Sequence, residues 1–150
     1  MIDSAALADL LGRWWFNYDE GNFDVLANLL TEDVHFTCRT DNDTVAWAEF
    51  ARADTSGRDT VMKWQTAHRQ DSPYPLRHNG SNVHIVDQRG DEATFASYIH
   101  VTQVMNESPV SVPGGIVTGT VRREGDMLRI AEFNVVLDTM NSDVFSNIKA

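Results

Sequence analysis

Near the start of the chain, apolar residues recur at steps of three and one, which is the spacing of one face of an α-helix. They are Leu7, Leu10, Leu11, Trp14, Trp15 and Tyr18. Asp3 or Ser4 is suited to cap the start of this helix, and Gly21 is suited to end it. A second group of apolar residues predicts another short helix at residues 23–30.

The middle of the chain alternates short elements with polar turns. The predicted elements, in order, are a turn at residues 31–33, a strand at 34–38, a polar loop at 40–43 and helices at 46–53 and 60–69. Pro73 and Pro75 break the last of these helices, because the residue before a proline disfavours the helical conformation.

The rest of the chain has the pattern of β-structure. The predicted strands are residues 81–87, 93–104, 116–123 and 128–137, with hairpin turns at 88–91 and 124–126. Residues 106–115, with Pro109 and Pro113, predict a long connection that is either a mobile flap over a pocket or an edge loop. Helices followed by an antiparallel meander predict an α+β fold. We expect a single domain over residues 1–150, with N-terminal helices packed on a curved, mainly antiparallel sheet.

Composition narrows the classes of function. A chain of 150 residues with 42% hydrophobic residues fits one globular domain. Its net charge of −10 repels nucleic acids and anionic membrane surfaces, so neither is an expected partner. No apolar run approaches the roughly 18 residues that cross a membrane, and the N-terminus lacks the features of a signal peptide. The lone Cys38 predicts no intrachain disulfide and a cytoplasmic location.

Asp19 departs from two local rules. It continues the apolar stripe of Leu11 and Trp15 at steps of four, and it lies near a helix C-terminus, where a negative charge opposes the helix dipole. Either a partner compensates the carboxylate inside a pocket, or the helix frays after Tyr18 and Asp19 faces water. Tyr18 also has two interpretations, a core aromatic or a phenol that donates a hydrogen bond to a substrate oxygen.

His78 is the second candidate for chemistry. If its strand is regular, His78, Asn82 and His84 share one face, although Gly80 can introduce a bulge. An imidazole can accept and return protons near neutral pH, whereas the alternative is a half-exposed histidine that bonds to the backbone. The sequence contains no zinc-motif spacing and no phosphate-binding glycine loop, so neither a metal nor a cofactor is predicted.

Three stretches carry a resemblance to a known superfamily. "NYDEGNFDVLANLLTEDVHF" resembles the opening of the SnoaL-like branch of the nuclear transport factor 2-like superfamily, where a helix ends in an aromatic–acid pair. "RHNGSNVHIVDQRGDEATFASYIHVT" is similar to the histidine-led strand block of that branch, and "GTVRREGDMLRIAEFNVVLD" is similar to its closing hairpin. The resemblance implies a cone-shaped α+β barrel with a deep apolar pocket, commonly in a homodimer.

Within this superfamily, the pattern of scytalone dehydratase fits best. Its tyrosine–aspartate pair matches Tyr18 and Asp19, and the histidine that pairs with the aspartate matches His78. Three other pocket residues of that enzyme, a tyrosine, a histidine and an asparagine, fall on or near Cys38, Gln103 and Val117. These departures disfavour scytalone itself as the substrate.

The resemblance implies a cofactor-free lyase or isomerase of secondary metabolism, of the dehydratase or polyketide-cyclase type, acting on a small apolar cyclic or polyketide-like molecule. His78 is expected to act as general base and then general acid, oriented by Asp19, while Tyr18 positions a substrate oxygen. The residues expected to contact the substrate are Trp14, Phe36, Cys38, Trp47, Met62, Trp64, Asn82, Gln103 and Val117.

Two alternatives to an enzyme stay open. One is a non-catalytic ligand-binding dimer, in which the Asp19–His78 contact is absent or side chains fill the pocket. The other is a structural β-type subunit of a ring-hydroxylating dioxygenase.

Overall fold

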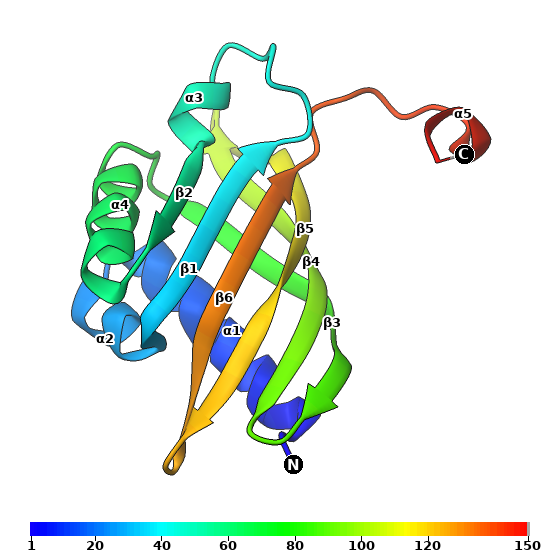
Figure 1. Ribbon diagram of the computed structural model, residues 1–150. Helices are drawn as coiled ribbons and strands as arrows, with labels where there is room; N and C mark the ends of the chain where they lie inside the picture. Colours follow the sequence, from blue (N-terminus) through cyan, green and yellow to red (C-terminus); the bar gives the residue numbers. More distant parts are fainter. Residues whose placement is uncertain (150) are drawn as a thin grey trace.

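The computed structural model describes residues 1–149 as one curved sheet with helices packed against it (Figure 1). The helices are α1 (Ser4–Glu20), α2 (Phe23–Asn28), α3 (Ala48–Ala51), α4 (Arg58–Gln70) and α5 (Phe145–Ile148). The strands are β1 (Leu30–Thr40), β2 (Ala53–Ser56), β3 (Leu76–Arg89), β4 (Glu92–Met105), β5 (Ser108–Glu124) and β6 (Met127–Leu137). In Figure 1, α5 stands apart from the sheet at the end of the chain.

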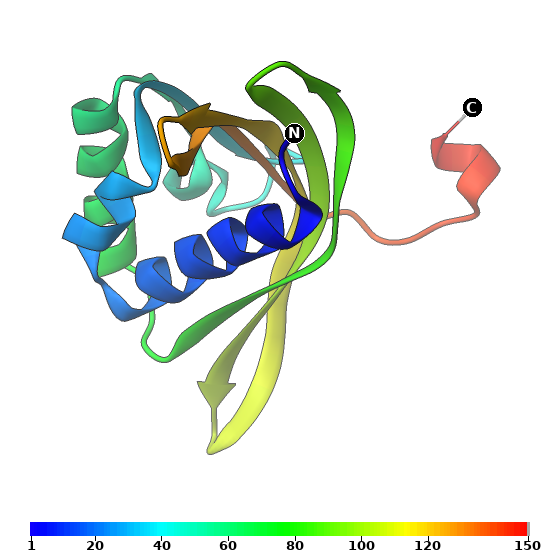
Figure 2. The same cartoon turned by 90° about the horizontal axis from the view of Figure 1, so that it is seen from below.

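The six strands form one sheet in the order β2-β1-β6-β5-β4-β3. Neighbouring strands run antiparallel except β1 and β6, which pair in parallel with Phe36 opposite Phe133. The sheet curls around α1, which lies across its concave side (Figure 2), while α4 packs on β1 and β2. The predicted α+β fold, with N-terminal helices on a curved and mainly antiparallel sheet, is confirmed.

Helix α1 forms where the apolar stripe predicts it. Asp3 caps its start by accepting a hydrogen bond from the backbone N–H of Ala5 at 3.0 Å. Gly21 ends it in the left-handed conformation, with a φ of 71°, which glycine adopts without steric penalty. All the residues of the predicted stripe are buried, and Asp19 is buried with them. The helix therefore carries its unusual carboxylate into the interior of the protein.

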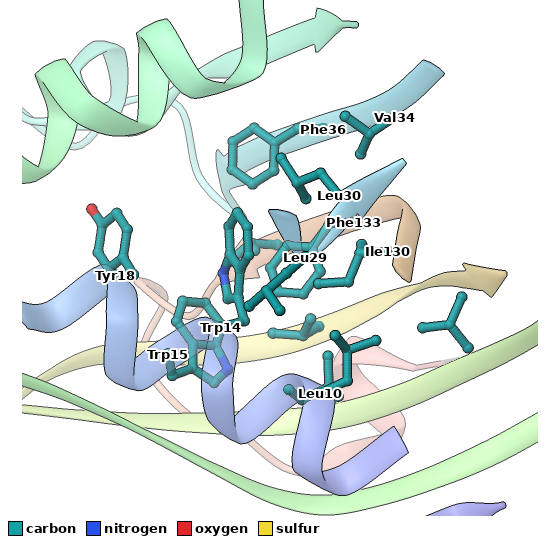
Figure 3. Packing of buried hydrophobic residues seen from close by; sticks show 14 of the residues in the cluster. Leu10, Trp14, Trp15, Tyr18, Leu29, Leu30, Val34, Phe36, Ile130 and Phe133 are labelled. Atoms are coloured by element: carbon teal, nitrogen blue, oxygen red, sulfur yellow. The ribbon is translucent and has the colours of Figure 1, made fainter. Parts of the chain in front are cut away.

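The core lies between α1 and the central strands β1 and β6. Figure 3 shows Trp14 and Trp15 of α1 beside Phe133 of β6, with Phe36 of β1 close by. The ring centroids of Trp14 and Phe133 are 5.3 Å apart. Burial of each such side chain contributes about 1.5–3 kcal/mol, so α1 is held firmly. Its last turn, which carries Tyr18, is fixed at one end of this core (Figure 3).

The prediction of a turn at residues 31–33 is wrong. β1 begins at Leu30, so these residues belong to the strand, and α2 ends at Asn28 rather than at residue 30. The backbone N–H of Ile130 in β6 donates a hydrogen bond to the carbonyl oxygen of Leu29 at 2.8 Å, directly before β1 begins. Pairing with β6 therefore overrides the polar composition of this segment.

The helices α3 and α4 occur where residues 46–53 and 60–69 predict helices, with shifted ends. β2 was not predicted, because its four residues lack a regular alternation and it forms only a short edge strand on β1. Among residues 1–149, no helix combines the length and the apolar character that a membrane span requires.

The prediction of a long connection at residues 106–115 is wrong as well. β4 and β5 continue as a hairpin, with Val101 opposite Val112 and Met105 opposite Ser108, and this arm extends beyond the rest of the sheet (Figure 2). β6 ends opposite Gly115, so the first part of β5 pairs with β4 alone. Prolines are tolerated on such a free edge, because an N–H that faces no neighbouring strand forms no hydrogen bond between strands.

β3 begins at Leu76, earlier than the predicted strand at residues 81–87, and so includes His78. A register shift between Ser81 and His84 interrupts its pairing with β4, and Asn82 there has a φ of 55°. The strand is therefore bulged at Asn82, and the regular alternation that would place Asn82 and His84 on the face of His78 does not hold.

Candidate active site

Asp19 and His78 meet where the end of α1 packs against the start of β3. The Oδ1 atom of Asp19 lies 2.6 Å from Nδ1 of His78, and its Oδ2 atom accepts the backbone N–H of His78 at 2.8 Å. The Asp19 and His78 side chains are only 6% and 12% exposed. A carboxylate that accepts the Nδ1 proton holds the imidazole in the tautomer with a bare Nε2. Nε2 is therefore the atom that can exchange a proton with a ligand.

Two neighbours hold this pair in place. The indole of Trp15 stacks on the imidazole of His78, with 4.6 Å between ring centroids and 5° between the planes. Arg69 donates two hydrogen bonds to the backbone carbonyl of Asp19, from Nε at 3.0 Å and from Nη2 at 2.8 Å. The guanidinium supplies positive charge at the helix end, where the helix dipole opposes a carboxylate. Fraying after Tyr18 does not occur, since α1 continues to Glu20.

A second polar pair stands beside the first. The hydroxyl of Tyr18 lies 2.7 Å from Nδ1 of His68, whose ring is stacked between Phe50 and Trp64. Burial lowers the pKa of His68 to about 4, so this imidazole is neutral at pH 7. Burial also raises the pKa of Tyr18 well above its usual value, although Arg69 opposes the shift. The contact is therefore a neutral phenol–imidazole hydrogen bond, and the tautomer of His68 decides which group donates.

The two polar pairs border two adjoining chambers. The inner chamber, of about 70 Å³, is lined by residues of α1, α4 and strands β1, β3, β4 and β6. The outer chamber, of about 380 Å³, is lined by residues of α3, the end of α4 and strands β1, β3, β4, β5 and β6. The residues that line both chambers are Cys38, His68, His78 and Leu137. Both histidines therefore stand where the two chambers adjoin.

This arrangement suits proton transfer to an organic ligand in an apolar setting. It offers a base oriented by a carboxylate, and a neutral phenol as a hydrogen-bond donor. The thiol of Cys38 adds no nucleophile at neutral pH, because burial raises its pKa to about 12. Within the described residues, no group of three or more His, Cys, Asp or Glu side chains is placed to hold a metal ion.

The sequence matches the SnoaL-like domain family over residues 1–134. The chain belongs to the SnoaL-like family. No curated protein matches it significantly.

Solved structures similar to this SnoaL-like protein include proteins of several different kinds. One is a nuclear transport factor 2-like protein with a cystatin-like fold from Novosphingobium aromaticivorans, 18% identical, with a TM-score of 0.73 over 97% of this chain and 86% of that one. A candidate scytalone dehydratase from the same organism is 18% identical, with a TM-score of 0.71 over 93% and 85% of the two chains. The β subunit of the benzoate 1,2-dioxygenase from Burkholderia mallei is 21% identical, with a TM-score of 0.71 over 91% of each chain. At these identities the likeness shows the fold alone.

Most of the predicted contact residues of this SnoaL-like protein line a chamber. Trp14, Phe36 and Trp64 line the inner chamber, and Cys38 lines both. The outer chamber includes Trp47 and Gln103. The apolar character predicted for the pocket is therefore present around His78.

Three predicted contact residues lie elsewhere. Met62 lines a separate surface hollow between α2 and α4, because it is turned by about 100° around the helix axis from the inward-facing Val61. Asn82 is exposed at the bulge in β3. Val117 is fully buried in the core and lines neither chamber.

Sequence reasoning placed Trp64 of α4 in the site but missed the polar residues that this helix contributes. This helix supplies His68 beside Tyr18 and Arg69 beside Asp19, and it places Gln65 against the inner chamber. Val61, Gln65 and Arg69 lie at steps of four and are all buried. Gln65 and Arg69 are polar residues in a buried helical stripe, as Asp19 is in α1. A search for polar residues at such positions would have identified this face of α4 from the sequence.

Proposed function

We propose that this SnoaL-like protein is a cofactor-independent acid–base enzyme, a dehydratase, isomerase or cyclase that acts on a small, largely apolar cyclic or polyketide-like molecule. The observation that carries the proposal is the Asp19–His78 pair, whose side chains are 2.6 Å apart and whose histidine lines both chambers. General acid–base catalysis contributes roughly 10²- to 10⁴-fold in rate, so a substrate already activated by a carbonyl group suits this site.

The first step is the same for all three reactions. Nε2 of His78 takes a proton from a carbon next to a carbonyl, and the electron pair of the broken C–H bond moves towards the carbonyl oxygen. Asp19 stabilises the imidazolium that forms. In a dehydratase, His78 then returns the proton to a hydroxyl on the next carbon, which leaves as water. In an isomerase the proton returns to another carbon. In a cyclase the new carbanion adds to the carbon of a second carbonyl and closes a ring, and His78 returns the proton to the alkoxide oxygen that forms.

Tyr18 is the proposed donor to the developing oxyanion. Its phenol is protonated at neutral pH, and burial raises its pKa further above the ordinary value of 10. If neutral His68 carries its proton on Nδ1, that N–H donates to the Tyr18 oxygen and leaves the phenol proton free for the substrate. His68 then positions the phenol, and a preorganised donor of this kind favours the transition state.

The alternative of a non-catalytic binder is less well supported than the enzyme. That alternative expects the Asp19–His78 contact to be absent or the pocket to be filled by side chains. The contact is present, and space remains on both sides of His78. The alternative of a dioxygenase β-type subunit has the support of the shared fold alone.

The proposal is tested with cyclic β-hydroxyketones, beginning with 3-hydroxycyclohexanone. Loss of water from this compound gives cyclohex-2-enone, whose conjugated double bond absorbs in the ultraviolet. We expect the protein to accelerate the reaction and His78→Ala to lower the rate by about 10²-fold or more. His84→Ala is the matched control, because His84 is an exposed histidine on the same strand. Equal rates for wild type and His78→Ala would contradict the proposed role of His78.

We also propose that the protein is a homodimer that pairs through the outer face of β4 and β5. Tyr98 and Ile116 lie opposite each other in the register of these strands and are 54% and 45% exposed. Large apolar side chains that adjoin on a surface favour an interface. Light scattering is expected to give the mass of two chains for wild type and of one chain for Tyr98→Lys. A wild-type mass of one chain would contradict this proposal.

A further inference from the structure

Gln65 has a buried side chain with an unmet hydrogen-bonding capacity. It is 3% exposed and lies on the inward face of α4, one turn after Val61 and one turn before Arg69. Within residues 1–149, its Nε2 atom has no hydrogen-bond partner. Buried amide donors are nearly always paired, so an unpaired one requires an explanation.

The surroundings of Gln65 indicate where its partner belongs. Gln65 lines the inner chamber, together with Tyr18, His68 and His78. Much of the remaining wall is hydrocarbon or aromatic, contributed by Trp14, Phe36, Ile99, Phe133, Val135 and Leu137. An amide donor beside an apolar space of about 70 Å³ is suited to bind one oxygen atom of a mostly apolar ligand.

The position of the histidines relates this amide to the reacting atoms. His78 lines both chambers, whereas Gln65 lines only the inner one. An oxygen held at the inner end by Gln65 therefore leaves the carbons next to it near the boundary, where His78 stands. The outer chamber, of about 380 Å³, then holds the body of the molecule. This volume suits one ring or two fused rings.

We propose that Gln65 selects the substrate by donating a hydrogen bond from Nε2 to a carbonyl or hydroxyl oxygen, which enters the inner chamber first. The ligand class is a cyclic ketone or phenol with an apolar ring body. The inference rests on the proposed function, because it assumes that these chambers bind the substrate. It adds the orientation of the bound substrate and the oxygen group that the site recognises. A site built to hydrogen-bond an oxygen rejects the analogue that lacks it.

The test compares the binding of α-tetralone with that of tetralin, the hydrocarbon of the same ring system. Binding is followed by tryptophan fluorescence, since Trp14, Trp15 and Trp64 line the inner chamber. We expect the ratio of the two affinities, ketone over hydrocarbon, to fall about tenfold in Gln65→Met, which keeps the side-chain length but removes the amide. Tetralin affinity is expected to stay the same or to rise in this variant.

Gln70→Met is the matched control, because Gln70 is an exposed glutamine on the same helix. It is expected to leave the affinity ratio unchanged. A ratio that Gln65→Met does not alter would overturn the inference, and so would a wild-type protein that binds neither compound. A melting curve of Gln65→Met establishes that the variant is folded before its ratio is compared.

A second measurement, by NMR, uses only the wild-type protein. The side-chain amide resonances of ¹⁵N-glutamine-labelled wild type are expected to include one that shifts with α-tetralone and not with tetralin. Identical responses to both compounds would overturn the inference. Neither experiment requires turnover, so the ketone preference persists even if His78 transfers no proton. If Gln65→Met leaves the affinity ratio unchanged while wild type catalyses the proposed reaction, the inference about Gln65 fails and the proposed function stands.

Discussion

The guanidinium of Arg69 binds the backbone carbonyl of Asp19, while the carboxylate of the same aspartate binds His78. The last turn of α1 is therefore held from two sides by residues that lie far away in the sequence. Arg69 also donates to the carbonyls of Ser72 and Pro73, so its buried charge is surrounded by oxygen acceptors. The carboxylate is stable at a helix C-terminus because this arginine supplies the positive charge that the helix end lacks.

Arg69→Met is expected to destabilise the protein strongly. It leaves the carbonyl of Asp19 buried without its donors and removes the positive charge from the helix end, which costs about 3 kcal/mol or more in the free energy of unfolding. Urea denaturation measures the effect. Arg13→Met is the control, since Arg13 forms only an exposed pair with Asp9 and is expected to change stability by less than about 1 kcal/mol. Similar losses for both variants would show that the carbonyl contacts contribute little.

Asp19→Asn is expected to keep the shape of the site and to lose its function. The amide cannot stabilise an imidazolium, and it no longer fixes the proton on Nδ1 of His78, so turnover should fall about 10²- to 10⁴-fold. The ¹⁵N chemical shifts of the His78 ring nitrogens report the tautomer directly. Glu20→Gln is the matched control, because Glu20 is the neighbouring carboxylate on the surface and bonds to Arg77 instead. An unchanged His78 spectrum in Asp19→Asn would argue against the orienting role.

Trp15→Leu tests the stacked support of His78. Loss of the indole leaves a cavity beside the imidazole and is expected to lower the free energy of unfolding by about 2–4 kcal/mol. Phe16→Ala, at the next and largely exposed position, is expected to change it by less than about 0.5 kcal/mol. Denaturant titrations of the two variants give the comparison. A Trp15→Leu protein as stable as Phe16→Ala would contradict the packing described for α1.

We expect the free energy of unfolding to depend on pH through His68. Its pKa is about 4 in the folded protein, below the ordinary histidine value of 6.5, so the unfolded chain binds more protons between these two values. Stability attributable to His68 is complete above pH 6.5 and is lost as the pH falls towards 4, by at most about 3 kcal/mol. Thermal denaturation across this range should show a shallower slope in His68→Gln than in wild type. His84→Gln, which alters an exposed histidine, should leave the slope unchanged.

The sequence predicted α1 and singled out Asp19 as unusual, because both the apolar stripe of the helix and the carboxylate within it are local features. Apolar spacing and two caps determine the helix, and a carboxylate in its buried stripe is visible without any knowledge of the fold. What compensates Asp19 was not predictable in this way. Arg69 is brought to it by the packing of α4, and a contact between residues so far apart has no local pattern.

The errors in the sheet have a common physical origin. The arm formed by β4 and β5 contains Pro109 and Pro113, which composition alone assigns to a loop. The bulge at Asn82 depends on how β3 pairs with β4, so it cannot be placed from alternation within one strand. Both features are decided by pairing between strands, whereas a pattern of apolar and polar residues describes one segment at a time.

Hydrogen–deuterium exchange tests the central claim most directly, because every proposed reaction begins with removal of a proton beside a carbonyl. α-Tetralone in D₂O is incubated with wild type, His78→Ala or Asp19→Asn, and proton NMR follows the signal of the CH₂ group next to the carbonyl. We predict that wild type accelerates the loss of this signal and that both variants reduce the acceleration by about 10²-fold or more. Exchange at equal rates with wild type and with His78→Ala would contradict the assignment of His78 as the general base.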